Sequence, residues 1–256
     1  MTWGTPAARR SAWLRVFHPR PSAATRLVCF PHAGGAASVF HGWADRLPPS
    51  TELVAVQYPG RQDRGHEEPV ADLDTLASLV APEVERLLDR PLVLFGHSLG
   101  ATIAFEVARR LRPRFPTPIS RLVVSARVPP ADSLPRDYDF RRDEDVRRYL
   151  RNVGGRAALV TENEELWRVS VPALRGDLLM AENYRYSGGA PLTCPITVVA
   201  AESDEDCGLA EMRGWSTYTV AAVDEHLLPG DHYYVDDPPD ELFAVLCRAS
   251  TAMADR

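Results

Sequence analysis

The sequence contains no lysine, and all 29 of its basic residues outside histidine are arginine. Enzymes that form Schiff bases, hold pyridoxal phosphate, bind nucleotides through a P-loop lysine or use a Ser-Lys pair all need an amine. A guanidinium group cannot replace that amine, so these classes are excluded. The formal net charge is −6, and we therefore expect no long-range attraction to nucleic acid.

Long apolar runs are also absent. No stretch approaches the roughly 20 consecutive apolar residues that span a bilayer, and residues 1–10 lack the apolar core of a secretion signal. The four cysteines lie too far apart in sequence for a zinc site or a dense disulfide framework: Cys29, Cys194, Cys207 and Cys247. We therefore expect a cytoplasmic protein with reduced thiols, no metal, no cofactor and no membrane partner.

The length of 256 residues, with 45% hydrophobic and 25% charged residues, predicts one domain spanning residues 1–256. Short runs rich in β-forming residues predict strands at 13–17, 26–30, 52–58, 91–96, 121–125, 196–200 and 220–228. Amphipathic patterns at 73–89 and 99–112 predict helices. The alternation, with several strands apolar on both faces, predicts an α/β fold whose mostly parallel central sheet is flanked by helices.

One connection is too long for this scheme. Residues 126–193 separate two predicted strands, where about 2 to 6 residues plus a helix is usual. The segment has helical patterns at 144–152, 162–169 and 172–184, and Pro172 is suited to the first turn of the last one. We predict that residues 126–193 form an inserted helical lid.

A GHSLG motif occupies residues 96–100, between a strand pattern and a helix pattern. It resembles the turn on which α/β hydrolases carry their nucleophilic serine. Small residues at Gly96 and Gly100 let the two backbones approach, and Ser98 then projects its hydroxyl above the sheet. The N–H of Leu99, at the free N-terminus of the helix, is suited to stabilise an oxyanion. In the alternative interpretation Ser98 only caps the helix.

A second oxyanion donor is expected from the loop after an earlier strand. The sequence PHAGGA at residues 31–36 follows such a strand, and we predict the N–H of Ala33 as this donor. The two glycines let the backbone turn towards the reaction centre. An ordinary glycine-rich turn is the alternative interpretation.

Seven histidines compete for the role of general base: His18, His32, His41, His66, His97, His226 and His232. In α/β hydrolases the nucleophile, the acid and the histidine follow in this chain order, so only His226 and His232 qualify. His226 lies inside a strand pattern. His232 follows the sequence PGD at the end of that strand, where loops carry catalytic groups, and we predict it as the base.

The acid is expected after the strand at 196–200. Four carboxylates stand in the turn that follows: Glu202, Asp204, Glu205 and Asp206. We predict Asp204, which lies three residues beyond Ala201. Asp206 and Glu202 remain alternatives.

Several segments together resemble the type II thioesterases of polyketide and nonribosomal peptide assembly lines, which are α/β hydrolases. They are WLR at 13–15, FPHAGG at 30–35, YPGR at 58–61, FGHSLGA at 95–101, PALRGD at 172–177 and PGDHY at 229–233. The resemblance implies Ser98, Asp204 and His232 as a triad, with Leu99 and Ala33 as oxyanion donors. The chain departs from the family at Ala201 and Asp231, where glycine is usual, and at Glu205, where proline is frequent.

The resemblance also implies a substrate and a partner. The substrate is an acyl group on the phosphopantetheine arm of an acyl or peptidyl carrier protein, and the role is removal of aberrant or stalled acyl groups by a monomeric enzyme. Five arginines of the predicted lid would suit an acidic carrier surface; they are Arg141, Arg142, Arg147, Arg148 and Arg151. Acidic residues lie among them in the sequence, and this mixture favours a solvated helix face instead.

Three other functions are weighed against this one. A small-molecule esterase or acyltransferase would share every catalytic residue. A noncatalytic hydrolase-like binding protein would need a broken triad, whereas all three residue types are present. A terminal cyclising domain is disfavoured because the chain starts near its first predicted strand, with no carrier domain before it.

Overall fold

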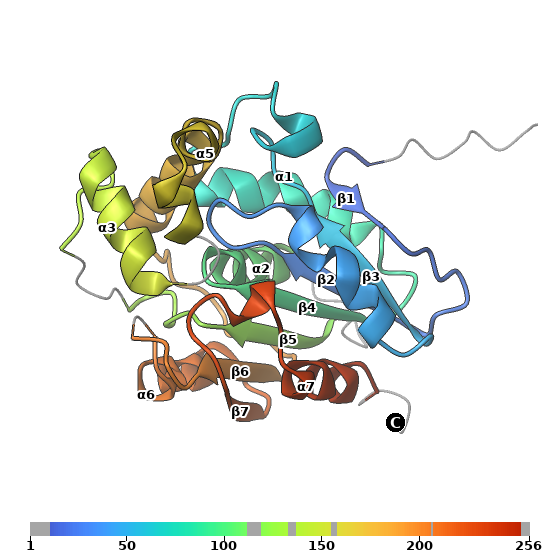
Figure 1. Cartoon of the computed structure of the whole chain (residues 1–256). Coiled ribbons are helices and arrows are strands. Elements are labelled where there is room, and N and C mark those ends of the chain that lie inside the picture. Colours follow the sequence, from blue (N-terminus) through green and yellow to red (C-terminus); the bar gives the residue numbers. More distant parts are fainter. Residues whose placement is uncertain (1–10, 112–118, 133–136, 155–157, 206, 252–256) are drawn as a thin grey trace, which may run out of the picture.

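The computed structural model describes residues 11–111, 119–132, 137–154, 158–205 and 207–251. Seven strands of these described segments form one sheet in the order β1-β3-β2-β4-β5-β6-β7 (Figure 1). All neighbouring strands are parallel except the β1–β3 pair, which is antiparallel. The strands are β1 (Leu14–Arg15), β2 (Thr25–Phe30), β3 (Thr51–Val56), β4 (Leu92–His97), β5 (Ile119–Ser125), β6 (Ile196–Ala201) and β7 (Val223–Leu228). The predicted mostly parallel sheet is confirmed.

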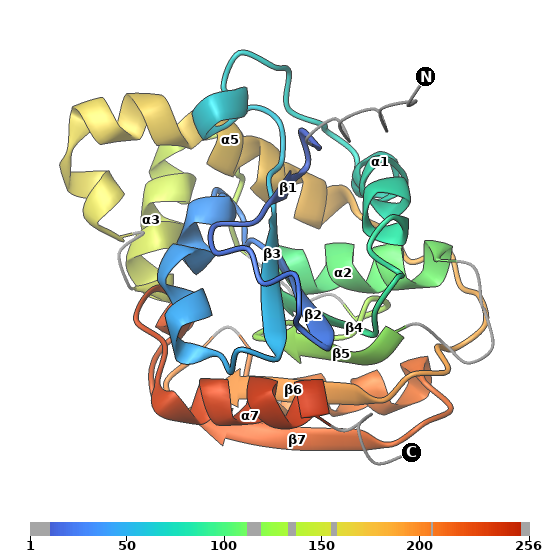
Figure 2. The same ribbon diagram turned by 90° about the vertical axis from the view of Figure 1, so that its right-hand side faces the viewer.

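Helices cover both faces of this sheet (Figure 2). The helices are α1 (Leu73–Glu85), α2 (Leu99–Arg110), α3 (Asp143–Val153), α5 (Glu164–Asn183), α6 (Leu209–Met212) and α7 (Asp240–Thr251). Within the described ranges, 3₁₀ segments accompany them: η1 (Ala37–Arg46), η2 (Gln62–Arg64), η3 (Val160–Glu162), η4 (Arg213–Tyr218) and η5 (Tyr234–Asp236). The predicted α/β fold with flanking helices is therefore observed.

The core has two halves because successive strand side chains point to opposite faces. In β2, Val28 and Phe30 join the cluster that includes α1 and α2, whereas Leu27 and Cys29 join the cluster that includes η1 and α7. Every residue of β3, β4 and β6 is buried. This double coverage explains the apolar residues at both odd and even positions of these strands.

The long connection between β5 and β6 contains α3, η3 and α5. Two separate helices were predicted at 162–169 and 172–184, with Pro172 starting the second. This prediction was wrong, because α5 runs unbroken over Glu164–Asn183 with Pro172 inside it. The proline costs one backbone hydrogen bond, but buried side chains on both sides of it, Trp167 and Leu174 among them, pack into the core. Tertiary packing therefore outweighs the local preference for a break.

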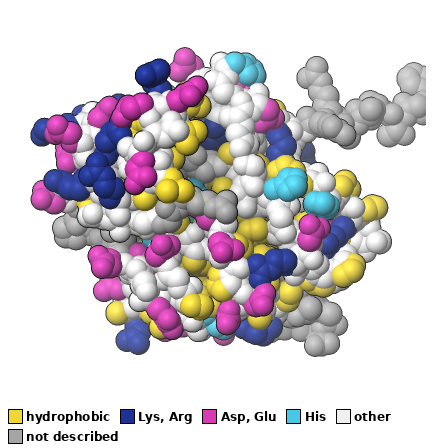
Figure 3. Space-filling model, in the orientation of Figure 1, with side chains coloured by type: hydrophobic (Ala, Val, Ile, Leu, Met, Phe, Trp, Pro, Cys, Tyr) yellow, Lys and Arg dark blue, Asp and Glu magenta, His cyan; other side chains and the backbone are white. Residues whose placement is uncertain are grey.

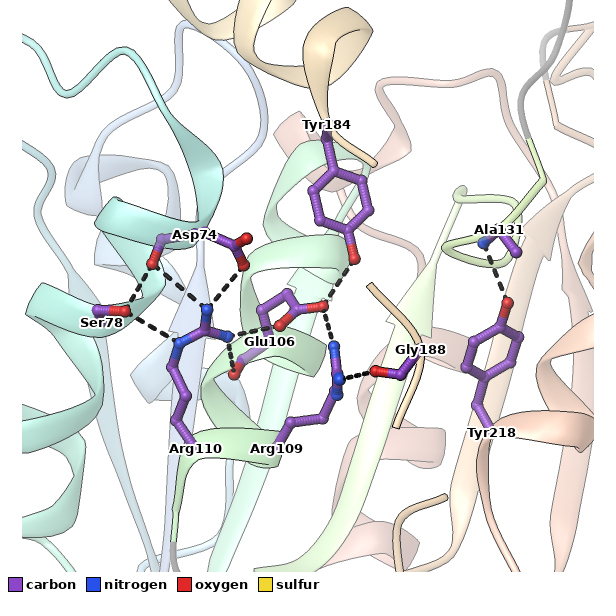
Figure 4. A network of polar contacts seen from close by, with 9 residues as sticks. All are labelled: Asp74, Ser78, Glu106, Arg109, Arg110, Ala131, Tyr184, Gly188 and Tyr218. Carbon is purple, nitrogen blue, oxygen red and sulfur yellow. Dashed lines mark hydrogen bonds and ion pairs between the residues drawn. The ribbon is translucent and has the colours of Figure 1, made fainter. Parts of the chain in front are cut away.

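Helix α2 buries a carboxylate, although charged side chains are seldom fully buried unless they are paired. Glu106 is 1% exposed. Its carboxylate pairs with Arg109 at 2.6 Å and with Arg110, and it accepts a hydrogen bond of 2.7 Å from the Tyr184 hydroxyl (Figure 4). Burial and this carboxylate raise the pKa of Tyr184 well above its ordinary value. The network joins α2 to the residue that follows α5.

Candidate active site

Three loops at one edge of the sheet bring Ser98, Asp204 and His232 together. These residues follow β4, β6 and β7 respectively. Because the three strands are parallel, their carboxyl ends share one edge, where open α/β sheets place their sites. All three residues are buried, with exposed fractions of 8%, 7% and 3%.

Ser98 lies at a strained turn between β4 and α2. Its backbone has φ 51° and ψ −122°, a left-handed conformation that side-chain-bearing residues rarely adopt. The N–H of Ser98 donates to the carbonyl of Ser125 at 2.9 Å, which ties the turn to the end of β5. No side-chain capping bond from Ser98 to α2 is present in this described segment. The geometry therefore argues against a role limited to helix capping.

The turn depends on two glycines. A Cβ atom at Gly96 would lie 2.2 Å from the carbonyl oxygen of Gly100, and one at Gly100 would lie 2.1 Å from that of Phe30. Such distances are far inside van der Waals contact. The β4–α2 turn therefore closes only with glycine at both positions, and Gly100 sets α2 against the end of β2.

We expect Gly100→Ala to lower the free energy of unfolding by more than the roughly 1–3 kcal/mol of ordinary overpacking, because its Cβ meets rigid backbone. The matched control is Gly176→Ala in α5, where an added Cβ has nothing within 4 Å. The Gly176→Ala control should raise the free energy of unfolding by up to about 1 kcal/mol, because alanine has a higher helix propensity than glycine. Urea unfolding measures both changes, and equal stability of the two variants would contradict the close approach.

The imidazole of His232 lies between the other two side chains. Its Nδ1 is 2.8 Å from Asp204 Oδ2, and its Nε2 is 3.2 Å from Ser98 Oγ. A carboxylate only accepts hydrogen bonds, so Nδ1–H donates to Asp204. Nε2 is then available to accept the proton of the Ser98 hydroxyl. This arrangement can activate a serine as a nucleophile.

The candidates for the acid of the triad differ in how far they are buried. Asp204 is buried, whereas Glu202 and Glu205 are exposed. Asp204 Oδ1 also accepts the N–H of Cys207 at 3.1 Å, which helps to orient the carboxylate. Asp206 lies outside the described residues. Of the described acids in this loop, only Asp204 is within hydrogen-bonding distance of His232.

The two predicted oxyanion donors belong to α2 and to the loop after β2. Leu99 is the first residue of α2, so its N–H has no carbonyl partner within the helix. Ala33 is buried in the loop after β2, and the backbone of the preceding Phe30 and Pro31 lies against Gly100. Both amides therefore belong to segments that meet at the serine turn.

His226 lies apart from this row, whereas the His97 ring packs against the His232 ring, with ring centroids 5.3 Å apart. His226 lies within β7, where it pairs with Val199. Burial, together with His232 and His32 nearby, lowers the pKa of His97 well below its ordinary value, so His97 stays neutral. Its Nδ1 lies 2.7 Å from Ser125 Oγ, which in turn hydrogen-bonds the hydroxyl of Tyr234. The GHSLG motif placed His97 beside Ser98 and suggested a role in packing or hydrogen bonding, but its particular partners, Ser125 and the His232 ring, are set by the fold.

Comparison with known proteins places the chain in a family. A model described as a thioesterase domain matches residues 25–248. The chain belongs to this thioesterase family. The predicted family and the predicted hydrolysis of thioesters are thereby confirmed.

Several relatives of this thioesterase are named for the biosynthesis of a particular product. The probable cadicidin biosynthesis thioesterase of Streptomyces griseus is 38% identical to this chain. The match covers 93% of this chain but only 65% of the length of that relative. The structure of the type II thioesterase BorB, from the borrelidin cluster, has a TM-score of 0.83 and 38% identity, covering 93% and 98% of the two chains. YbtT, a type II thioesterase from the yersiniabactin pathway, has a TM-score of 0.82 and 30% identity, covering 94% and 99%.

One cavity adjoins the site of the thioesterase, and a second lies beneath α5. One of about 190 Å³ opens beside Asp204 and His232, where the end of α3 borders it. A larger one of about 480 Å³ lies between the loop after β5 and the end of α5, with Val128, Phe140 and Leu178 in its wall. Among the described residues, no helix is long and apolar enough to cross a membrane, and no cluster of His, Cys, Asp or Glu is arranged to hold a metal.

Proposed function

We propose that this thioesterase hydrolyses acyl thioesters on the phosphopantetheine arms of acyl or peptidyl carrier proteins, and that it removes aberrant or stalled acyl groups. The observation that carries the proposal is the hydrogen-bonded row of Ser98, His232 and Asp204 in a chain of the thioesterase family. The similarity to BorB and YbtT, which come from a biosynthetic cluster and a biosynthetic pathway, supports the carrier-bound substrate.

In the proposed mechanism Ser98 Oγ attacks the thioester carbonyl while His232 Nε2 takes its proton. Asp204 orients the imidazole and stabilises its positive form. The N–H groups of Leu99 and Ala33 stabilise the oxyanion. The thiolate leaves readily because the pKa of a thiol is about 8.5. The departing thiolate takes up the proton held by the His232 imidazolium. Water, deprotonated by the neutral imidazole, then attacks the acyl carbonyl, and His232 returns this proton to Ser98 Oγ as the free acid leaves. No cofactor is required.

We propose that residues 126–193 act as a lid over the acyl group. The larger cavity lies against α5, and its wall includes apolar side chains such as Leu178. Arg127, which also lines the cavity, donates to the hydroxyl of Thr102, one turn beyond Ser98 on α2. One residue of the cavity wall thus contacts the helix that begins at the proposed nucleophile, and we propose that this cavity takes the acyl chain.

The lid arginines give little support for a docking surface. Acidic and basic side chains intermingle over α3 and α5 (Figure 3). Arg147 pairs with Glu164 at 2.6 Å and Arg148 with Asp145 at 2.8 Å. Each pair has one well-exposed partner, Glu164 or Arg148, as on a solvated helix face. The carrier proteins remain proposed partners without an assigned contact surface, and the monomeric state and cytoplasmic location remain predictions from the sequence.

We expect the enzyme to release free acid from an acyl carrier protein with a higher kcat/KM than from an oxygen ester of the same acyl chain. The better leaving group and the contacts of the phosphopantetheine arm both favour the thioester. Mass spectrometry of the released acid measures both rates. Release from the oxygen ester alone would favour a small-molecule esterase, and transfer of the acyl group to an added alcohol or amine would favour an acyltransferase.

A further inference from the structure

Two segments that the mechanism does not use meet inside the molecule. Arg61 ends the YPGR sequence after β3, and Asp177 ends the PALRGD sequence within α5. The guanidinium of Arg61 holds both carboxylate oxygens of Asp177, at 2.7 Å and 3.0 Å. Their side chains are only 7% and 3% exposed. The two segments therefore form one buried, bidentate ion pair across 116 positions of sequence.

This ion pair also holds the loop of the proposed oxyanion donor. Asp177 Oδ2 accepts the N–H of Gly34 at 2.8 Å, and Arg61 donates to the carbonyl of Gly35 at 3.1 Å. These two glycines directly follow Ala33. The loop after β2 is thus fixed at two successive residues by charged groups that belong to other elements.

Helix α5 lies directly against the same loop. A Cβ atom at Gly34 would lie 3.1 Å from Leu174 Cδ1, and Gly34 has φ +72°. Leu174 and Asp177 lie three residues apart and so share one face of the helix. The contact made by α5, which belongs to the proposed lid, therefore combines an apolar side chain with the buried carboxylate.

Stability alone is a weak explanation for such a pair. Removing one partner of a buried ion pair is strongly destabilising, whereas replacing both partners by apolar residues of similar size is often neutral or stabilising. The hydrogen bonds to Gly34 and Gly35, in contrast, are specific in direction. A group that fixes backbone amides next to an oxyanion site contributes to rate, because donors must be oriented before charge develops.

We infer that Asp177 and Arg61 are positioning residues that hold the N–H of Ala33 in place only while α5 is docked on the loop. Closure of the lid and completion of the oxyanion site are then one event. This inference rests on the proposed function, since it assigns a role around the same serine.

The test uses the full chain and two double variants. Arg61→Met/Asp177→Leu removes the pair without leaving a buried charge. Its matched control, Arg175→Met/Asp143→Leu, removes the ion pair between α5 and α3, which makes no contact with the oxyanion loop among the described hydrogen bonds. The readouts are the rate of Ser98 labelling by a fluorophosphonate, kcat and KM for the acyl carrier thioester, and the melting temperature.

We expect the Arg61/Asp177 double variant to fold. Its rate of Ser98 labelling and its kcat should both fall on the order of 10²-fold, as when one oxyanion donor is lost. Its KM should stay within about threefold of the wild-type value. The control should react like wild type. A folded double variant with wild-type labelling and kcat would overturn the inference, and so would loss of folding, which would assign the pair to stability. Wild-type protein that labels but releases no acid from the carrier would contradict the proposed function instead.

Discussion

Replacing Ser98 by alanine is expected to lower kcat for thioester hydrolysis by on the order of 10⁶, as in other serine triads. The variant keeps the imidazole, the carboxylate and both amides, but it lacks the oxygen that forms the acyl-enzyme. The hydroxyl lies 3.2 Å from His232 Nε2 and makes no cap on α2 in the described segment. Its loss should therefore leave the fold intact. Stopped-flow or mass-spectrometric assay of acid release measures the rate.

The control for this experiment is Ser203→Ala. Ser203 is exposed and lies in the loop of the proposed acid, where its backbone N–H, which alanine keeps, donates to the carbonyl of Gly230. Its alanine variant should keep wild-type turnover and fluorophosphonate labelling. Equal acid release by the Ser98→Ala variant and wild type, after correction for uncatalysed hydrolysis, would end the serine mechanism.

The sheet was predictable because its strands are buried on both faces. A strand such as β4, buried at every residue, cannot alternate between polar and apolar residues, and a short apolar run between helix patterns is typical of a parallel strand covered on both sides. The edges of the elements were less accurate. The pattern at 220–228 extends before β7, which begins at Val223, because β-forming residues also occur in the turn that precedes a strand.

Helix α5 and Glu106 show where local patterns fail. Proline usually marks a helix start or break, yet Pro172 lies inside α5 because residues on both sides gain burial. A glutamate is seldom fully buried, yet Glu106 is buried because Arg109, Arg110 and Tyr184 satisfy its charge. In both cases the deciding partners are distant or depend on the final packing.

The location of the proposed site followed from topology, whereas its supporting contacts did not. Ser98 and His232 each follow a parallel strand, so one edge of the sheet had to collect them. The pairing of Arg61 with Asp177 joins residues 116 positions apart, and no periodicity in either segment marks it. Such contacts can be identified only when the position of α5 in the fold is known.

Replacing Asp204 by asparagine is expected to lower kcat by about 10⁴, less than the loss of Ser98. An amide can present an N–H to His232 Nδ1, which would favour the tautomer with the proton on Nε2 and remove the acceptor for the Ser98 hydroxyl. It also lacks the charge that stabilises the imidazolium. Because Asp204 Oδ2 lies 2.8 Å from Nδ1, both effects act directly on the base. Steady-state kinetics measures the loss.

The matched controls are the other carboxylates of the same turn. Glu202 and Glu205 are exposed, so Glu202→Gln and Glu205→Gln should change kcat by less than about threefold, because exposed charges interact weakly through water. Asp206→Asn tests the remaining alternative. A loss of about 10⁴ in the Glu202 or Asp206 variant, with Asp204→Asn near wild type, would move the acid along the turn. The nucleophile and the base would keep their assignments, because the contact between Ser98 and His232 does not involve the acid.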